Sequence, residues 1–229
     1  MIFEDNDLMV VEKPVGWVVN DSATAHALPT IQKWVEANFD WPLAHNTLFR
    51  NGVVHRLDKD TSGLLILAKN EVAFLALQKA FKERRVEKQY LALVHGKVKT
   101  LLGEIDQPIM RNPGNRRKFG VFFGGRPSLT RYEVLKTYEH SGRSFALIAC
   151  YPKTGRTHQI RVHMRYLGHS LVGDPVYTER KMVKVDRLLT DRIFLHAAKI
   201  SFTHPTTKQQ VSFESPLPEE LEMVLTKLE

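Results

Sequence analysis

The sequence predicts an α+β fold in which helices pack on a mixed, mostly antiparallel central sheet. The strand-like segments are short, some are linked as hairpins, and helix-like segments do not alternate strictly with them. A doubly wound parallel sheet requires regular alternation and is therefore less favoured. Because no repeat or low-complexity linker interrupts the 229 residues, we expect a single domain over residues 1–229.

Six apolar runs bounded by turn-forming residues predict strands. The turn KPVG, from Lys13 to Gly16, places proline and glycine in turn-forming order after the first run. The expected strands are Leu8 to Glu12, Leu64 to Lys69, Tyr90 to Val94, Thr130 to Leu135, Phe145 to Cys150 and Ile193 to Phe202.

Four segments have the apolar spacing and end signals of helices. In the third, Ile160, Met164 and Leu167 form one stripe, and Gly168 follows as a C-cap. The basic cluster KERRVEK, residues 82–88, ends the second helix, and its cations complement the helix dipole, so they need no other function. The expected helices are Thr30 to Asn38, Glu71 to Arg84, Thr157 to Leu167 and Pro218 to Leu228.

The charge balance points to a polyanionic partner. There are 33 Lys and Arg against 25 Asp and Glu, a net charge of +8. Residues 109–136 carry seven cations and only one acid, Glu133, so this segment is expected to face the polyanion. Phe119, Phe122 and Phe123 interleave with these cations, which fits either base stacking or the core of a hairpin. A solvated basic surface is the alternative for the charge as a whole.

Cysteine content and the amino terminus indicate the compartment. The single cysteine, Cys150, lies in an apolar run and is expected to be a buried, inert thiol, so a reducing compartment fits. The acidic start MIFEDNDLMV is not a targeting signal, and no apolar run approaches the roughly 20 residues that span a bilayer. We therefore expect a soluble, cytoplasmic protein with no membrane association.

The octet from His55 to Ser62 is polar and lies between two apolar segments, where a cleft places working side chains. It contains Asp58, which by itself is more typical of a turn than of a catalyst. Tyr90 shares a strand face with Ala92 and Val94, which leaves room for a flat ligand. An ordinary core tyrosine explains the same pattern.

The helix that follows residue 156 carries further candidate side chains. Arg161 lies at the edge of the apolar stripe, from which a guanidinium can form a bidentate pair with a carboxylate in a cleft. The helix start, from Arg156 to His158, can receive a phosphate. A solvated basic helix is the alternative of equal weight.

Five segments together resemble the RluA-type RNA pseudouridine synthases, in the order found in that family and from about residue 3 to 218. The most specific is the signature HRLDKDTSGLLILAK, which contains Asp58. The others are EDNDLMVVEKPVGWVV, EKQYLALVHG, TGRTHQIRVHMRYLGHSLVGDPVY, and LHAAKISFTHP with SPLP.

The resemblance implies the catalytic fold of pseudouridine synthases and a set of residue roles. Asp58 becomes the catalytic aspartate, Tyr90 the aromatic residue under the target base and Arg161 the basic partner of Asp58. Arg56 becomes the side chain that enters the RNA stack where the uridine leaves. Whether the carboxylate attacks the anomeric carbon or acts as a base stays open.

The resemblance also implies the partners. The substrate would be ribosomal or transfer RNA, with no cofactor and no metal, and we expect a monomer without a separate amino-terminal RNA-binding module. The expected RNA contacts, besides Arg56, are Arg116, Arg117, Lys118, Arg156 and His158.

Two other classes of protein remain as alternatives. A non-catalytic RNA-binding module would keep the basic residues without requiring Asp58, Tyr90 and Arg161 together. A glycosidase would require a second carboxylate, and Asp60 is too close in sequence to oppose Asp58 across a sugar. A metal enzyme is weaker still, because the two histidines of HQIRVH are five residues apart rather than four.

Overall fold

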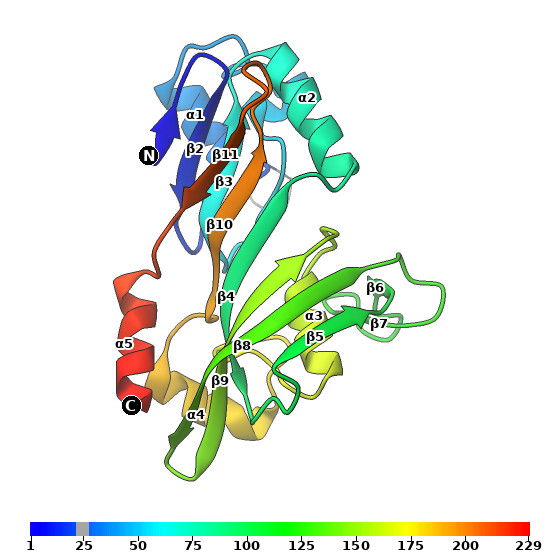
Figure 1. Ribbon diagram of the computed structural model, residues 1–229, viewed down its shortest axis with the longest axis vertical. Coiled ribbons are helices and arrows are strands. Elements are labelled where there is room, and N and C mark those ends of the chain that lie inside the picture. The colour runs from blue at the N-terminus through cyan, green and yellow to red at the C-terminus, as the bar shows by residue number, and fades with distance from the viewer. Residues whose placement is uncertain (22–27) are drawn as a thin grey trace. The chain divides into compact units, whose positions relative to one another are not determined.

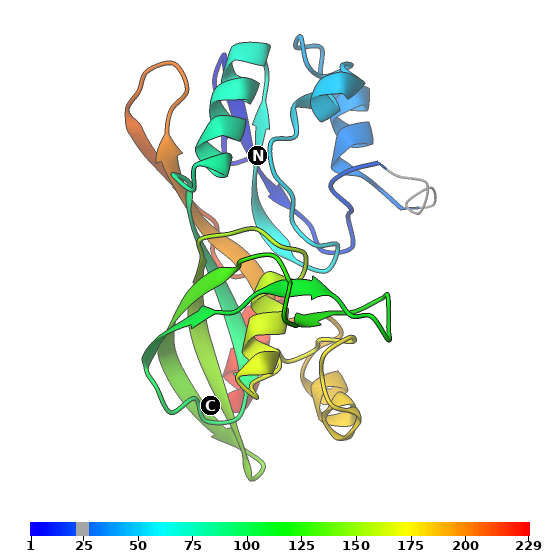
Figure 2. The same ribbon diagram turned by 90° about the vertical axis from the view of Figure 1, so that its right-hand side faces the viewer.

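The computed structural model describes residues 1–21 and 28–229 (Figures 1 and 2). The chain forms two compact units: the first comprises residues 1–88 and 197–215, and the second residues 89–196 and 216–229. Because both units are discontinuous in sequence, neither is a linear segment of the chain. The single functional domain expected over residues 1–229 stays a prediction.

The first unit is built on a sheet with strand order β1-β2-β3-β10, and β11 pairs with β10. The pairs β1·β2, β2·β3 and β10·β11 are antiparallel. The register sets Val10 opposite Ile66 and Ile200 opposite Phe213. The strands are β1 (Phe3–Glu4), β2 (Leu8–Lys13), β3 (Ser62–Ala68), β10 (Leu195–Thr203) and β11 (Gln210–Glu214), and the helices are α1 (Ile31–Asn38), the 3-10 helix η1 (Thr47–Gly52) and α2 (Glu71–Lys82).

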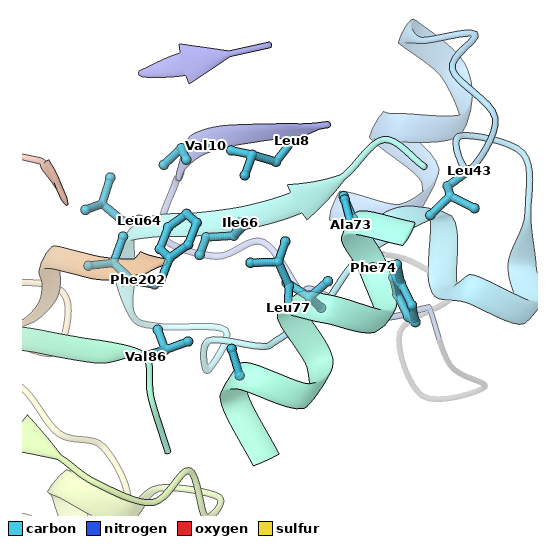
Figure 3. Packing of buried hydrophobic residues seen from close by; sticks show 14 residues of the cluster. Leu8, Val10, Leu43, Leu64, Ile66, Ala73, Phe74, Leu77, Val86 and Phe202 are labelled. Atoms are coloured by element: carbon cyan, nitrogen blue, oxygen red, sulfur yellow. The ribbon is translucent and has the colours of Figure 1, made fainter. Parts of the chain in front are cut away.

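The core of the first unit lies between α2 and this sheet (Figure 3). Leu77 of α2 points toward Ile66 of β3, whereas Phe74 packs edge-on against Phe49 of η1 at 5.2 Å between ring centroids. All seven residues of β3 are buried, as expected for a strand covered on both faces. β3 thereby gives a rigid end to the polar octet that precedes it.

The second unit has the strand order β4-β9-β8-β5, again antiparallel, and a separate hairpin of β6 and β7. The strands are β4 (Glu87–His95), β5 (Leu102–Asp106), β6 (Ile109–Arg111), β7 (Phe119–Val121), β8 (Leu129–His140) and β9 (Arg143–Pro152). The helices are α3 (Gln159–Tyr166), α4 (Arg180–Leu189) and α5 (Glu219–Leu228).

Side chains alternate across the second sheet and build two cores. Ala92 and Ile148 face the cluster that contains Met164 of α3. Leu93, one residue further along β4, belongs instead to the cluster that contains Leu221 of α5. Period-two alternation therefore gives each face of the sheet its own helix.

A bulge in β8 lets this strand serve both cores. The register shifts between Val134 and Lys136, and the intervening Leu135 is exposed. Tyr132 therefore belongs to the α3 core and Tyr138 to the α5 core, although an even spacing would put both on one face.

The fold confirms the predicted α+β class. All six predicted strands and all four predicted helices are present, with ends shifted by a few residues, and Gly168 takes the left-handed conformation (φ +87°) expected of a C-cap. The prediction missed η1, α4, β1, β5, β6, β7 and β11, which are short or follow weak patterns. Among the described residues, no helix combines the length and apolar character that a membrane span requires.

Candidate active site

The octet of the signature is anchored to β3 by its first residue, His55. Its Nε2 accepts the backbone N–H of Ile66 at 2.9 Å, and its ring stacks on Phe81 of α2 at 4.6 Å between centroids. Desolvation within the fold lowers the pKa of His55 to about 3, and the nearby charge of Lys88 adds to this effect. His55 is therefore neutral at physiological pH and acts as a fixed hydrogen-bond acceptor.

A fully buried lysine holds the middle of the octet. Lys13, at the end of β2, has no exposed surface, and its ammonium donates to the carbonyl oxygens of Pro14, Trp17 and Lys59 at 2.8, 2.9 and 3.1 Å. The N–H of Gly16 also donates to the Lys59 carbonyl at 2.9 Å. The KPVG turn, predicted as a simple end of the first strand, thus also binds the backbone beside Asp58.

Asp58 is half-buried, with the buried Leu57 before it and the exposed Lys59 after it. Thr61 is buried as well, whereas Arg56 is exposed. The N–H of Thr61 donates to the Asp58 carbonyl at 3.1 Å, which closes the turn. At Gly63 a Cβ atom would lie 2.3 Å from the Ala197 carbonyl, so only glycine allows β3 and β10 to approach here. The octet therefore presents Asp58 from a backbone that hydrogen bonds hold in place.

Tyr90 lies on β4 opposite Cys150 of β9 and is half-buried. Its ring packs beside the α3 core, on the face shared with Ala92 and Val94. This agrees with the predicted face and small neighbours. It also gives Tyr90 a packing role, so a base contact stays a prediction.

Arg161 of α3 is almost fully buried, with 2% of its surface exposed, and forms a bidentate ion pair. Its Nε and Nη2 donate to the two carboxylate oxygens of Asp174 at 2.8 and 2.9 Å. The guanidinium also lies 5.1 Å from the ring centre of Tyr177. The expected bidentate geometry is therefore present with Asp174. The expected pairing of Arg161 with Asp58 stays a prediction.

The start of α3 is packed rather than open. His158 takes a left-handed conformation (φ 56°), and its Nδ1 lies 2.9 Å from the Tyr177 hydroxyl. Arg156 is half-buried, and its Nε donates to the Pro127 carbonyl at 3.3 Å. These contacts give both side chains a structural role. The phosphate contact expected here stays a prediction.

The loop 112–118, between β6 and β7, carries the expected RNA-binding cations. Asn112 organises it: its N–H donates to the Lys118 carbonyl at 2.9 Å, and its side-chain oxygen accepts two backbone N–H groups of the loop at 2.8 and 3.1 Å. Arg116 and Arg117 are exposed. These two arginine side chains thus project into solvent from a loop held by hydrogen bonds, and Lys118 is half-buried.

The two histidines of HQIRVH make contacts within the second unit. His163 is fully buried, with Nδ1 2.9 Å from the Thr130 hydroxyl and Nε2 3.0 Å from the Gln107 carbonyl, so both ring nitrogens have protein partners. Within residues 1–21 and 28–229, the side chains that could hold a metal are Asp5, Asp7 and His204. These belong to the other unit, and His204 Nε2 is paired with Asp5 at 2.8 Å.

Three residues of the site neighbourhood were missed from the sequence. A lysine in a turn does not suggest a fully buried ammonium, so Lys13 gave no signal. Asp174 and Tyr177 stand in GDPVY, which follows α3 closely, and an acid and an aromatic shortly after a buried arginine are the signal that could have found them.

The comparisons with known proteins agree with this geometry. A family model described as RNA pseudouridylate synthase matches residues 7–166, which is more than half of the chain. An uncharacterized RNA pseudouridine synthase of Bacillus subtilis is 39% identical over 226 residues, covering 99% of this chain and 71% of the relative. The ribosomal large subunit pseudouridine synthase D of Zymomonas mobilis is 35% identical over 246 residues, covering 100% and 72%.

A solved structure agrees as well. Human RNA pseudouridylate synthase domain containing 1 has a TM-score of 0.75 and 32% sequence identity, over 95% of this chain and 82% of that chain. The fold and the matched sequence define an RNA-modifying isomerase. The chain belongs to the RNA pseudouridylate synthase family. This confirms the family and the enzyme class that the sequence predicted.

Proposed function

We propose that this synthase modifies uridine in large-subunit ribosomal RNA and that Asp58 is its catalytic carboxylate. One observation carries the role of Asp58: this carboxylate is half-buried beside the buried Leu57, on a backbone held by His55 and Lys13. Catalytic groups must be fixed in this way, because a small misplacement costs much of the rate.

The reaction is an isomerisation and conserves every atom. The bond between the ribose anomeric carbon and uracil N1 breaks, the base turns, and the anomeric carbon joins uracil C5. C5 then loses its hydrogen as a proton while N1 gains one, so the step needs no oxidant, reductant or energy source. A carboxylate suffices, as nucleophile at the anomeric carbon or as base at the adjacent ribose carbon.

The remaining site residues support this carboxylate. Tyr90 offers an aromatic face to the extruded base. Arg161 provides a cation that favours the ionised form of the carboxylate. Asp174 binds the Nε and Nη2 edge of Arg161, which fixes the plane of the guanidinium and leaves its Nη1 edge outside that pair.

The substrate class rests on the relatives and on charge. Relatives that are 35 to 40% identical are named for the large ribosomal subunit. The ordered basic loop and the net charge of +8 suit a structured polyanion. We further propose that the enzyme acts as a cytoplasmic monomer without cofactor or metal. The fully buried Cys150, with a thiol pKa raised by desolvation, fits a reducing compartment.

Replacing Asp58 with asparagine tests the catalytic role. Asp58→Asn removes the charge at nearly constant shape, so turnover should fall by at least about 100-fold while RNA affinity and thermal unfolding stay near wild type. Release of tritium from RNA labelled at uracil C5 measures turnover, because that hydrogen leaves only when the new bond forms.

The matched control is Asp60→Asn, which removes the same charge from a half-buried aspartate of the same turn. It should keep most of the activity. An Asp58→Asn enzyme within tenfold of wild type would remove Asp58 from catalysis. Binding without any product in the wild type would favour the non-catalytic RNA-binding alternative.

Mapping pseudouridine in total RNA from a strain that lacks this gene tests the substrate. We expect the loss of one or more sites in large-subunit ribosomal RNA. Losses confined to transfer RNA would overturn the ribosomal assignment while leaving the isomerase activity in place.

A further inference from the structure

The hairpin of β6 and β7, together with the turn that follows it, forms a basic hairpin over residues 109–126. One side of it is buried: Ile109 packs with Val162 of α3 and with Tyr177, and Phe119 and Val121 pack against the same cluster. The figures show β6 and β7 beside α3 in both views (Figures 1 and 2). This side of the hairpin is therefore fixed within the second unit.

The turn at residues 122–125 leaves one phenylalanine side chain in solvent. Phe122 lies over Gly120, where a Cβ atom would come within 2.6 Å of its ring. The N–H of Gly125 donates to the Phe122 carbonyl at 3.1 Å, and Gly124 takes a φ of +80°. As a result Phe122 is 37% exposed, whereas Phe123 is 104% exposed, as fully as in an extended chain.

The three phenylalanines of this segment therefore divide. Phe119 is a core residue of the hairpin, and the Arg111 guanidinium lies 4.9 Å from its ring centre. Phe122 packs within the turn. Phe123 makes no packing contribution that would explain a large aromatic residue at this position. Of the two roles expected for these rings, packing therefore applies to Phe119 and Phe122, and base stacking is left for Phe123.

The charge around Phe123 favours a nucleic acid as its partner. The sequence contains no Asp or Glu from Gln107 to Tyr132. Such a positive field opposes a second copy of the same surface and attracts phosphates. Cations around an exposed aromatic face are the combination by which proteins hold single-stranded RNA. The cations of the basic hairpin are Arg111, Arg116, Arg117, Lys118 and Arg126.

We propose that Phe123 stacks on the base of an unpaired nucleotide while the cations of the basic hairpin contact the backbone on either side of it. This inference rests on the proposed function and adds to it a contact that reads unpaired rather than paired RNA. Stacking is tolerant of sequence, because every base has a flat face. Phe123 is thus a positioning contact for the substrate and takes no part in the chemistry.

Three substitutions at one position test the proposal with an unstructured 12-residue uridine oligonucleotide as the probe. Phe123→Ala and Phe123→Leu should each raise the Kd by about 5- to 150-fold, because neither side chain has an aromatic face. The salt dependence of the affinity should stay at the wild-type slope, because no charge is removed. Phe123→Trp should keep the wild-type affinity, and its fluorescence should be quenched on binding more strongly than that of the wild type.

The matched control is Leu188→Ala, which removes an 80% exposed apolar side chain from α4 of the same unit and should leave the Kd unchanged. All four variants should unfold at the wild-type temperature, because none of these side chains is packed. If Phe123→Leu bound with wild-type affinity, the contact would be apolar rather than aromatic, and stacking would be overturned. A changed salt slope would overturn stacking as well.

Unchanged affinity in both truncated variants, with turnover on folded RNA intact, would overturn this inference alone. A wild-type protein that neither binds nor modifies RNA would overturn the proposed function and this inference together.

Discussion

At the scale of the residue, His55 links the signature to β3 through a hydrogen bond that requires a neutral ring. Its Nε2 accepts the Ile66 N–H, and a protonated ring has no lone pair at that atom. The low pKa of about 3 therefore follows from the fold, because an unfolded histidine titrates near 6.5. Protonation of His55 at low pH should therefore break the hydrogen bond that links the octet to β3.

The expected pH effect has a definite sign. Between about pH 6.5 and 3 the unfolded chain binds a proton at residue 55 that the folded chain does not, so the free energy of unfolding falls by up to about 1.4 kcal/mol per pH unit as the pH decreases. His55→Gln, which keeps an acceptor near the same place, should lose this contribution. Urea unfolding of both proteins from pH 7 to 5 measures the difference.

A second substitution serves as the control. His45→Gln changes an exposed histidine of the same unit and should leave the pH dependence of stability unaltered. If wild type and His55→Gln showed the same acid slope, His55 would be protonated normally in the fold.

Arg56 and Asp58 share the open side of the octet, because Leu57 between them is buried. Extruding a uridine leaves a gap in the RNA stack, and a planar guanidinium can fill that gap whereas an ammonium cannot. Arg56→Lys should therefore lower kcat/KM by about 10- to 100-fold on folded RNA, where unstacking costs a few kcal/mol. On an RNA whose target uridine is already unstacked, the loss should be slight.

Turnover of the two RNAs, compared in one assay, measures the effect. Arg50→Lys, at an exposed arginine of the same unit, should be mild on both. Equal and severe losses with Arg56→Lys on both RNAs would place Arg56 in the fold or in the chemistry.

At the scale of the element, Tyr177 joins the basic hairpin to α3. Its hydroxyl accepts the Phe119 N–H of β7 at 3.0 Å and lies 2.9 Å from His158 at the start of α3. Its ring lies beside the guanidinium of Arg161. One side chain thus connects β7 of the basic hairpin with the helix that carries a proposed site residue.

Tyr177→Phe keeps the ring and removes only the hydroxyl. The Phe119 N–H then lacks its acceptor, so the free energy of unfolding should fall by about 1–3 kcal/mol. Urea unfolding measures this change. Tyr166→Phe, at an exposed tyrosine of α3, is the control and should have almost no effect. A stability of Tyr177→Phe equal to wild type would mean that water replaces the hydroxyl.

At the scale of the whole molecule, the net charge of +8 makes RNA affinity depend on salt. Replacing Arg116, Arg117 and Lys118 together with glutamine should flatten the plot of log affinity against log salt. The expected change is about 0.7 per contact for a single strand, or about 2 if all three cations touch phosphates.

A triple variant at the end of α2 controls for net charge alone. Changing Lys82, Arg84 and Arg85 to glutamine removes the same charge from residues explained by the helix dipole. That variant should keep the wild-type slope. If the wild type and both triple variants had equal slopes, the cations of the basic loop would be ordinary solvated residues that do not contact phosphates.

The sequence by itself determined the parts of the fold that depend on local patterns. Helices begin and end where capping residues occur. The Thr30 hydroxyl accepts the Lys33 N–H at the start of α1, and Gly168 follows the end of α3. The apolar run from Leu64 to Ala68, short and bounded by polar residues, predicted the strand that forms there. The local pattern predicted a polar turn between two apolar runs, and the resemblance of the signature motif to the family made Asp58 the candidate carboxylate.

The tertiary structure alone decided features that depend on partners distant in sequence. Short strands such as β5 and β7 exist only because another strand supplies their hydrogen bonds, and the bulge at Leu135 is a property of two paired strands rather than of one. Lys13 is buried because three carbonyls converge on its ammonium, one of them 46 residues away. Arg161 pairs with Asp174 for the same reason: a charge is buried only where the folded chain supplies its counterpart, and no local pattern shows which residue that will be.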